Sequence, residues 1–213
     1  MRLSRKPIKK FFLNDHVFYV LENVYEPAED TFLLAENFRV HKNDFVLDMG
    51  TGCGILGVLA AEKAKAVVAV DINPCAVSCA KMNAELNGVE RKMGVLRGDL
   101  FQPIKEGKRF DVILFNAPYL PSEPEEKKTW IEQAWAGGVG GRDLIDRFLS
   151  EVPKCLKVNG RILLVQSTLS DVDRTMQAFE KAGLQAKVVA EEKVAFETIV
   201  VVEAKFGKHK RSI

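Results

Sequence analysis

The segment Phe45-Val-Leu-Asp-Met-Gly-Thr-Gly-Cys-Gly54 decides the fold of this 213-residue chain. Its first four residues are a short apolar run, typical of a buried strand, and the run stops at Gly50. Residues 54–64 follow with the composition of a helix. The glycines at alternate positions let the backbone turn tightly and approach a ligand. A strand, a glycine turn and a helix predict an α/β sheet with a ligand site at the carboxyl end of the strand.

The alternation of strands and helices continues along the chain. We predict further strands at 66–70, 95–97, 111–115 and 161–165, and helices at 74–87, 143–156 and 171–182. Asn73 and Pro74 are typical of a helix start. The last β-rich runs, 186–190 and 198–202, are too close for a crossover helix, so we expect an antiparallel hairpin. The predicted fold is a mostly parallel sheet with helices on both faces.

The composition is that of one globular α/β domain. Hydrophobic residues make up 47% of the chain and charged residues 28%, which excludes a disordered or collagen-like chain. No apolar run approaches the roughly 20 residues that span a bilayer, and the basic first ten residues lack the apolar stretch of a signal peptide. We therefore expect a soluble cytoplasmic protein. The four cysteines form no C-x-x-C pair and only three histidines are present, so we expect no metal site.

The charge is uneven along the single domain that we predict over residues 1–213. The basic ends, residues 1–10 and 205–213, hold nine of the 31 positive charges and no acid, so the middle has 22 positive and 29 negative charges. Such ends are usually solvated tails, and contact with RNA or a ribosome is the alternative. The acidic middle argues against an extended DNA-binding face.

The glycine segment has the chemistry of a nucleotide-type site. Its spacing is G-x-G-x-G, not the dinucleotide G-x-G-x-x-G. Asp48, directly before the loop, would repel a pyrophosphate and suits a ligand with a cationic amino-acid end, such as S-adenosylmethionine. Asp71 ends the second strand, where a carboxylate accepts hydrogen bonds from ribose hydroxyls, and Asp99 follows the third strand, toward an adenine. A plain glycine turn with Asp71 as a cap is the alternative, and acids at three strand ends disfavour it.

The fourth strand ends in Phe115-Asn-Ala-Pro-Tyr119. The side-chain oxygen of Asn116 and the carbonyl of Ala117 can accept hydrogen bonds from an NH2 group, which fixes its nitrogen in line with a methyl donor. Tyr119 can pack flat against a planar target. A buried asparagine beside a strand-ending proline is the structural alternative. The motif favours a planar nitrogen acceptor.

The chain resembles the class I S-adenosylmethionine-dependent methyltransferases, and within them the HemK-like protein glutamine methyltransferases. Their signature is Asn-Pro-Pro-Tyr, so Ala117 departs from it. Methyltransferases that act on adenine and cytosine amino groups share this signature. Three segments are similar to the branch that modifies class I release factors in eukaryotes and archaea: Val24-Tyr-Glu-Pro-Ala-Glu-Asp-Thr-Phe-Leu-Leu34, residues 132–138 and residues 141–148. The resemblance covers about residues 24–203 and implies a Rossmann-like fold with a seven-stranded sheet.

The resemblance implies methyl transfer to the side-chain amide nitrogen of glutamine in the Gly-Gly-Gln motif of a class I release factor. It implies Asn116, Pro118 and Tyr119 as catalytic residues, with Ala117 joining them in substrate binding, and the irregular stretch 120–142 as the substrate mouth. The cofactor residues are expected to be Thr31, Asp48, Gly50, Thr51, Gly52, Gly54, Asp71, Ile72, Asp99, Leu100 and Asn116.

The resemblance also implies a partner, a small zinc-binding activator protein that adds strands along the edge strand near Met93–Arg97. Two other functions stay open at this point. The first is an adenine amino-group methyltransferase acting on DNA or RNA, which the acidic middle and the lack of a target-recognition domain disfavour. The second is a nucleotide-binding module without chemistry, which the intact Asn116, Pro118 and Tyr119 disfavour. The glycine spacing disfavours a nicotinamide dehydrogenase.

Overall fold

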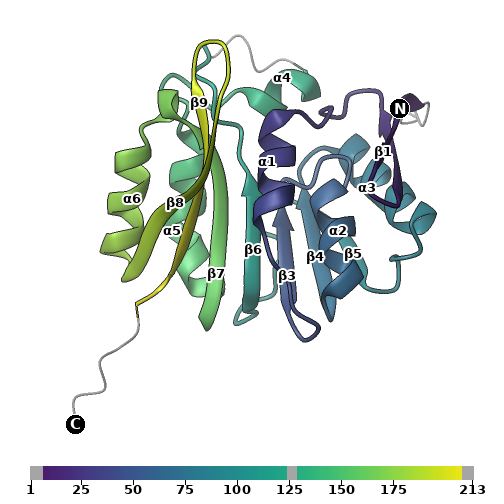
Figure 1. Cartoon of the computed structure of the whole chain (residues 1–213), viewed down its shortest axis with the longest axis horizontal. Helices are drawn as coiled ribbons and strands as arrows, with labels where there is room; N and C mark the ends of the chain where they lie inside the picture. Colours follow the sequence, from purple (N-terminus) through teal and green to yellow (C-terminus); the bar gives the residue numbers. More distant parts are fainter. Residues whose placement is uncertain (1–6, 124–128, 208–213) are drawn as a thin grey trace.

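A seven-stranded sheet forms the centre of the computed structural model, which describes residues 7–123 and 129–207 (Figure 1). The strand order is β5-β4-β3-β6-β7-β9-β8. The strands are β3 (Phe45–Met49), β4 (Ala66–Asp71), β5 (Met93–Arg97), β6 (Phe110–Asn116), β7 (Leu156–Ser167), β8 (Leu184–Lys193) and β9 (Thr198–Phe206). Strands β5, β4, β3, β6 and β7 are parallel, and β9 pairs antiparallel with both β7 and β8. The predicted Rossmann-like sheet and its C-terminal hairpin are confirmed.

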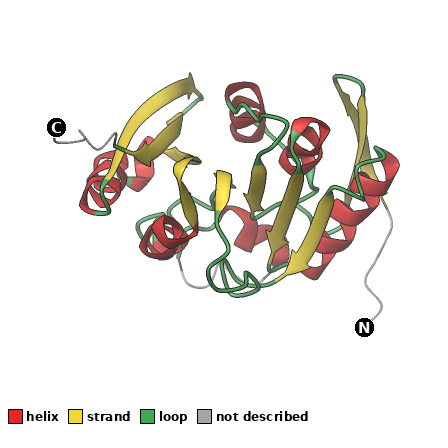
Figure 2. Cartoon of the chain, turned by 90° about the horizontal axis from the view of Figure 1, so that it is seen from below, coloured by secondary structure: helices red, strands yellow, loops and turns green. Residues whose placement is uncertain are grey.

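Helices cover both faces of this sheet (Figure 2). They are α1 (Glu29–Asn37), α2 (Ile55–Lys63), α3 (Pro74–Leu86), α4 (Trp130–Trp135), α5 (Asp143–Cys155) and α6 (Val172–Lys181), with a 3-10 turn, η2, at Thr168–Ser170. Helix α3 begins as predicted, since the Asn73 side chain accepts a hydrogen bond from the Cys75 amide and Pro74 opens the first turn. Among the described residues, no helix combines the length and apolar character needed to cross a bilayer.

The central strands β3 and β6 determine where the candidate functional site lies in the fold. Strands β3 and β6 are almost wholly buried, as expected of parallel strands covered on both faces. They pair so that Met49 lies opposite Phe115, which brings the glycine loop after β3 beside the Asn116 motif that ends β6. The chain leaves β3 toward β4 on one side and reaches β6 on the other. This change of direction opens a crevice at the carboxyl ends of the strands.

An N-terminal hairpin, β1 (Pro7–Leu13) with β2 (His16–Leu21), was not predicted. Two asparagines, Asn83 in α3 and Asn87 at its C-cap, bind the edge of β2 as a neighbouring strand would. The Asn83 side chain accepts from the Tyr19 amide (2.9 Å) and donates to the Tyr19 carbonyl (2.8 Å). Asn87 does the same for Val17 (3.0 and 2.8 Å). One face of a helix thus satisfies a strand edge, because residues four apart on the helix meet residues two apart on the strand.

The hairpin corrects the predicted N-terminal tail. Residues 7–10 belong to β1, and Lys205 and Phe206 belong to β9, so both basic ends are shorter than expected. The remaining charges of these ends, on Arg2, Arg5, Lys6, Lys208, Lys210 and Arg211, lie outside the described residues. Strand β9 ends beside the start of β7, because Lys205 pairs with Arg161.

Candidate active site

A cavity of about 350 Å³ lies in the crevice at the carboxyl ends of the strands. Its volume is in the range of small-molecule sites. The glycine loop, the ends of β4, β5 and β6, and helices α1 and α4 all contribute to its wall. The predicted site residues that line it are Thr31, Gly50, Thr51, Gly52, Asp71, Ile72, Asp99, Leu100, Asn116, Ala117, Pro118 and Tyr119.

The glycine loop is tied to the end of β4. The Thr51 amide donates to the Val70 carbonyl (3.0 Å) and the Gly52 amide to Asp71 Oδ2 (2.9 Å). The other carboxylate oxygen of Asp71 accepts from the Asn73 amide (2.8 Å). Burial raises the pKa of Asp71, and hydrogen bonds from the backbone amides of Gly52, Asn73 and Ile72 oppose this shift. Each carboxylate oxygen keeps a further lone pair, so this fixed group can still accept hydrogen bonds from a ligand's hydroxyls.

Two predicted cofactor residues lie beneath the loop, outside the set of described residues that line the cavity. Asp48 is fully buried, and its Oδ2 accepts from the Thr51 hydroxyl (2.5 Å), while Oδ1 has no hydrogen-bond partner among the residues that the structure describes. Burial raises the pKa of Asp48 to about 7. Gly54 has a φ of +89°, and a Cβ there would lie 2.9 Å from Ala80 Cα. Asp48 therefore supports Thr51, and Gly54 lets α2 pack closely on α3.

The end of the cavity near Ile72 and Asp99 combines apolar and charged side chains. Ile72 lines it and is 46% exposed, which leaves an apolar surface for a flat ring. Asp99 Oδ2 forms an ion pair with Arg147 Nη2 at 2.8 Å, and both residues line the cavity. Leu100 is buried with a φ of +46°, a conformation that costs a residue with a Cβ about 1 kcal/mol or more. Such conformations are common in binding sites.

Asn116 presents an unused acceptor at the other end. Its Nδ2 donates to Thr31 Oγ1 (3.1 Å) on α1, whereas its Oδ1 is buried with no partner among the described residues. A buried oxygen without a partner is unfavourable unless a ligand supplies a donor. Ala117 and Tyr119 follow it, both buried and both lining the cavity. The motif is therefore built to receive a group with N–H or O–H donors.

Asp30 and Tyr25 were not predicted as site residues. Both line the cavity, and Asp30 is only 6% exposed. The Asp30 carboxylate accepts hydrogen bonds from the hydroxyls of Tyr25 (3.1 and 3.2 Å) and Tyr119 (3.4 Å). Burial, reinforced by the Asp30 charge, raises the pKa of both tyrosines well above its usual range. Both residues lie in the segment Val24–Leu34, whose similarity to one branch of the family gave neither of them a role.

The stretch 120–142 is more regular than expected. It contains α4, which a Thr129–Glu132 capping box starts, and both Trp130 and Trp135 line the cavity. The strand-like segment at Leu120 runs beside residues 136–138, where the Leu120 amide donates to the Trp135 carbonyl (3.0 Å) and the Gly137 amide to the Leu120 carbonyl (2.8 Å). This stretch forms one wall of the cavity. Pro124 lies outside the described residues.

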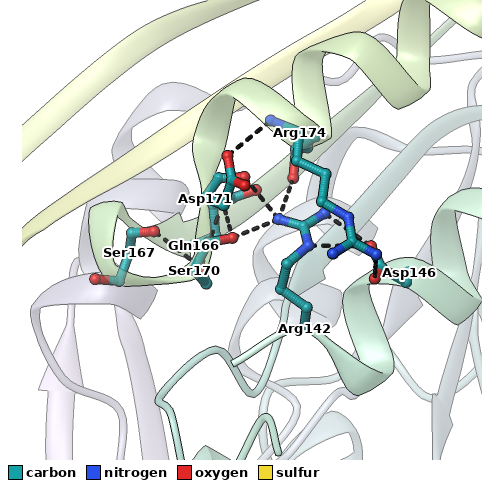
Figure 3. A network of polar contacts seen from close by, with 8 residues as sticks. Arg142, Asp146, Gln166, Ser167, Ser170, Asp171 and Arg174 are labelled. Atoms are coloured by element: carbon teal, nitrogen blue, oxygen red, sulfur yellow. Dashed lines mark hydrogen bonds and ion pairs between the residues drawn. The ribbon is translucent and has the colours of Figure 1, made fainter. Parts of the chain in front are cut away.

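Arg142 anchors the end of this wall (Figure 3). Its guanidinium is buried and donates to the carbonyls of Ser170 and Asp171, to Thr175 Oγ1 (3.1 Å) and to Asp146 Oδ1 (2.8 Å). Gly141 comes so close to the Tyr119 carbonyl that a Cβ there would lie 2.2 Å from its oxygen. The contacts of Arg142 thus fix the glycine segment against the backbone of the Asn116 motif.

The comparisons with known proteins agree with this geometry. The model of the methyltransferase small domain family matches residues 25–199. The chain belongs to this family. A protein of Methanocaldococcus jannaschii named "Putative protein N5-glutamine methyltransferase" is 43% identical over 183 residues, covering 85% of this chain and 91% of that protein. The human methyltransferase HEMK2 is 30% identical over 192 residues, covering 85% of this chain and 89% of that protein.

A solved structure shares the fold. The E. cuniculi Mtq2–Trm112 complex, described as responsible for methylation of the eRF1 translation termination factor, contains a chain that matches with a TM-score of 0.68. The match covers 87% of this chain and 99% of that chain at 24% identity. The resemblance to HemK-like protein glutamine methyltransferases is thereby confirmed.

Membership of this methyltransferase family implies S-adenosylmethionine as the cofactor. The cavity fits that molecule: it joins a carboxylate suited to ribose hydroxyls, an apolar surface at Ile72 and the backbone of a glycine loop. Among the described residues, no three His, Cys, Asp or Glu side chains group in a way that could hold a metal ion.

Proposed function

We propose that this methyltransferase modifies the side-chain amide nitrogen of glutamine in the Gly-Gly-Gln motif of a class I translation release factor, with S-adenosylmethionine as the methyl donor. The observation that carries the proposal is the buried Asn116 Oδ1, which has no hydrogen-bond partner in the part of the chain that the structure describes, on a residue that lines the cavity beside Ala117. Relatives named as protein glutamine methyltransferases support the choice of acceptor.

The residues of the chain explain how such a nitrogen is prepared. The amide lone pair is delocalised, so the nitrogen is a poor nucleophile. Asn116 Oδ1 and the Ala117 carbonyl accept its two N–H bonds, which orients the nitrogen and stabilises positive charge that develops on it. The bound cofactor would supply an electrophilic methyl group, and the nitrogen would lose one of its two protons to solvent after the transfer. Tyr119 stacks on the planar amide, and Pro118 fixes the turn between them. Ala117 replaces the usual proline but keeps its carbonyl.

Adenine in DNA or RNA is the alternative acceptor, because its amino group offers the same two N–H donors. A transfer assay with labelled S-adenosylmethionine separates the two. Label on the release factor, located at the Gly-Gly-Gln glutamine by mass spectrometry, supports the proposal. Label on nucleic acid alone contradicts it.

We also propose that a small zinc-binding activator protein pairs with the edge strand β5. The solved structure of Mtq2 in a complex with a second protein, Trm112, supports the presence of a partner. Strand β5 ends the described sheet, and its Leu96 is 39% exposed. An unpaired edge of this kind is a ready template for added strands. Co-expression with a candidate partner tests the idea, which fails if the chain alone is monodisperse and fully active.

Finally, we propose RNA or ribosome contact through the basic ends, aided by the opposite end of the sheet from the cavity. Five segments before or at the start of β3 to β7 carry eleven Lys or Arg and four Asp or Glu, namely residues 39–44, 62–65, 87–92, 103–109 and 154–159. Strand β9 ends there too. Lys42→Glu with Lys63→Glu should weaken binding of labelled RNA about tenfold and flatten its salt dependence. The control variant, Lys81→Glu with Lys187→Glu, should bind labelled RNA as the wild type does. An equal loss of affinity in both variants would contradict the proposal.

A further inference from the structure

The side-chain carboxylate of Asp30 is the acceptor in all of its hydrogen bonds with described residues. Its donors are the Tyr25 and Tyr119 hydroxyls, the Thr31 amide (2.5 Å) and the Thr31 hydroxyl (3.1 Å). Four donors converge on one carboxylate that is 6% exposed, so it acts as an acceptor on both oxygens. It lies in the first turn of α1, within hydrogen-bond distance of the two tyrosines, Tyr25 and Tyr119, that line the cavity.

The direction in which the Thr31 hydroxyl donates its single proton determines the orientation of the Asn116 side-chain amide. Because this proton points to Asp30, the Thr31 oxygen has only lone pairs to offer to Asn116. Asn116 must therefore turn its NH2 group toward Thr31, which leaves its buried Oδ1 as the end without a partner among the described residues. The two ends of an asparagine amide are nearly equal in size, so this hydrogen-bond direction distinguishes them.

We propose that Asp30 is a positioning residue that sets, through Thr31, which end of the Asn116 amide faces the acceptor, and thereby makes the site select a glutamine amide over a glutamate carboxylate. The inference rests on the proposed function and adds a reason for its specificity. An outward Oδ1 accepts from the N–H of glutamine and repels the oxygens of glutamate. A buried polar group that finds no partner discriminates strongly between such isosteres.

The chemistry requires a carboxylate at position 30. An asparagine there could donate its own N–H to Thr31 Oγ1, which frees the Thr31 proton to point at Asn116. Asn116 would then turn its oxygen toward Thr31 and its NH2 toward the cavity. The site would present a donor to a donor, and the preference for glutamine over glutamate would fall.

The test compares Asp30→Asn and Thr31→Val with the matched control Glu29→Gln, which changes an exposed carboxylate one residue away. Two quantities are measured on the whole 213-residue chain. The first is kcat for a class I release factor. The second is inhibition by the same factor with glutamate in place of its Gly-Gly-Gln glutamine. Both variants should lower kcat about tenfold to a hundredfold and bind the glutamate form at least about fivefold better relative to the glutamine form. Thr31→Ser should restore the preference that Thr31→Val loses.

A second measurement needs no substrate. In protein labelled with 15N-asparagine, the Asn116 side-chain amide is identified by its loss in Asn116→Ala. Its protons should exchange slowly with solvent in the wild type and at least about tenfold faster in Asp30→Asn, because they turn from Thr31 to the open cavity.

The outcomes separate the two ideas. Unchanged exchange in Asp30→Asn, or an unchanged glutamine-to-glutamate preference with a lower kcat, overturns the role of Asp30. Faster exchange in Asp30→Asn together with a wild type that does not methylate release factor supports the role of Asp30 and refutes the proposed acceptor. A Glu29→Gln effect equal to that of Asp30→Asn also overturns the inference.

Discussion

Replacing Asp48 by asparagine tests the buried carboxylate beneath the glycine loop. Asp48 is fully buried, its Oδ1 has no hydrogen-bond partner within residues 7–123 and 129–207, and burial raises the pKa of this carboxyl group to about 7. In an unfolded chain the pKa of an aspartate is about 3.9. Between these values the folded protein keeps a proton that the unfolded chain has lost. Folding is therefore weakened as the pH rises from about 4 to 7, and little more is lost above that.

The size of the effect follows from the two pKa values. Each pH unit in this window lowers the free energy of unfolding by about 1.4 kcal/mol, so the wild type should lose about 2–3 kcal/mol through Asp48 between pH 5 and pH 8. The side chain at position 48 of Asp48→Asn cannot ionise, so this variant should keep the free energy of unfolding that the wild type loses through Asp48. Its absolute stability also includes the cost of placing an amide in the same site, so the comparison is between the two pH dependences.

Urea unfolding followed by circular dichroism at pH 5, 6, 7 and 8 measures this difference. The stability of Asp48→Asn relative to the wild type should rise by about 2–3 kcal/mol over the series. Asp173→Asn removes the same charge from an exposed position on α6 and should follow the wild type. If the curves of Asp48→Asn and the wild type run parallel, the folded protein does not protonate Asp48 and the reasoning is refuted.

Three further predictions concern the cofactor, the cavity wall and the hairpin. Asp71→Ala should weaken S-adenosylmethionine binding by about 1–3 kcal/mol in calorimetry, since it removes a pair of acceptors, and unchanged affinity would misplace the ribose. Arg142→Met should raise KM for the protein substrate and lower stability by about 2–4 kcal/mol, whereas Arg174→Met should cost under about 1 kcal/mol because its ion pair is exposed. Asn83→Ala should cost about 2–4 kcal/mol in denaturant unfolding by freeing β2, and a loss below about 1 kcal/mol would contradict that role.

Local patterns predicted most of the sheet. The apolar run at Phe45, its glycine stop and the Asn73-Pro74 helix start each depend on neighbours in sequence, and the structure has them where they were expected. The hairpin β1–β2 could not be found in this way. Its second strand is satisfied by Asn83 and Asn87, more than 60 residues away, and no pattern within β2 indicates that partner.

The residues of the candidate site were likewise predicted only in part from local sequence patterns. Acids at strand ends placed Asp71 and Asp99 on the cavity wall. Asp48 and Gly54 belong to the same motif, yet one lies beneath the loop and the other packs on α3, because sequence spacing does not reveal depth. Asp30 lies in the segment Val24–Leu34, and no role was predicted for it. Its contact with Tyr119 joins residues 89 apart, and only the fold brings them together.

The measurement that tests the central claim most directly is methyl transfer to a purified class I release factor, by the wild type and by Asn116→Ala, with labelled S-adenosylmethionine and the candidate activator present. The wild type should label the Gly-Gly-Gln glutamine, and Asn116→Ala should bind the cofactor with nearly the same affinity but lose transfer by about a hundredfold or more. Full activity of Asn116→Ala, or label that never reaches that glutamine, would contradict the account.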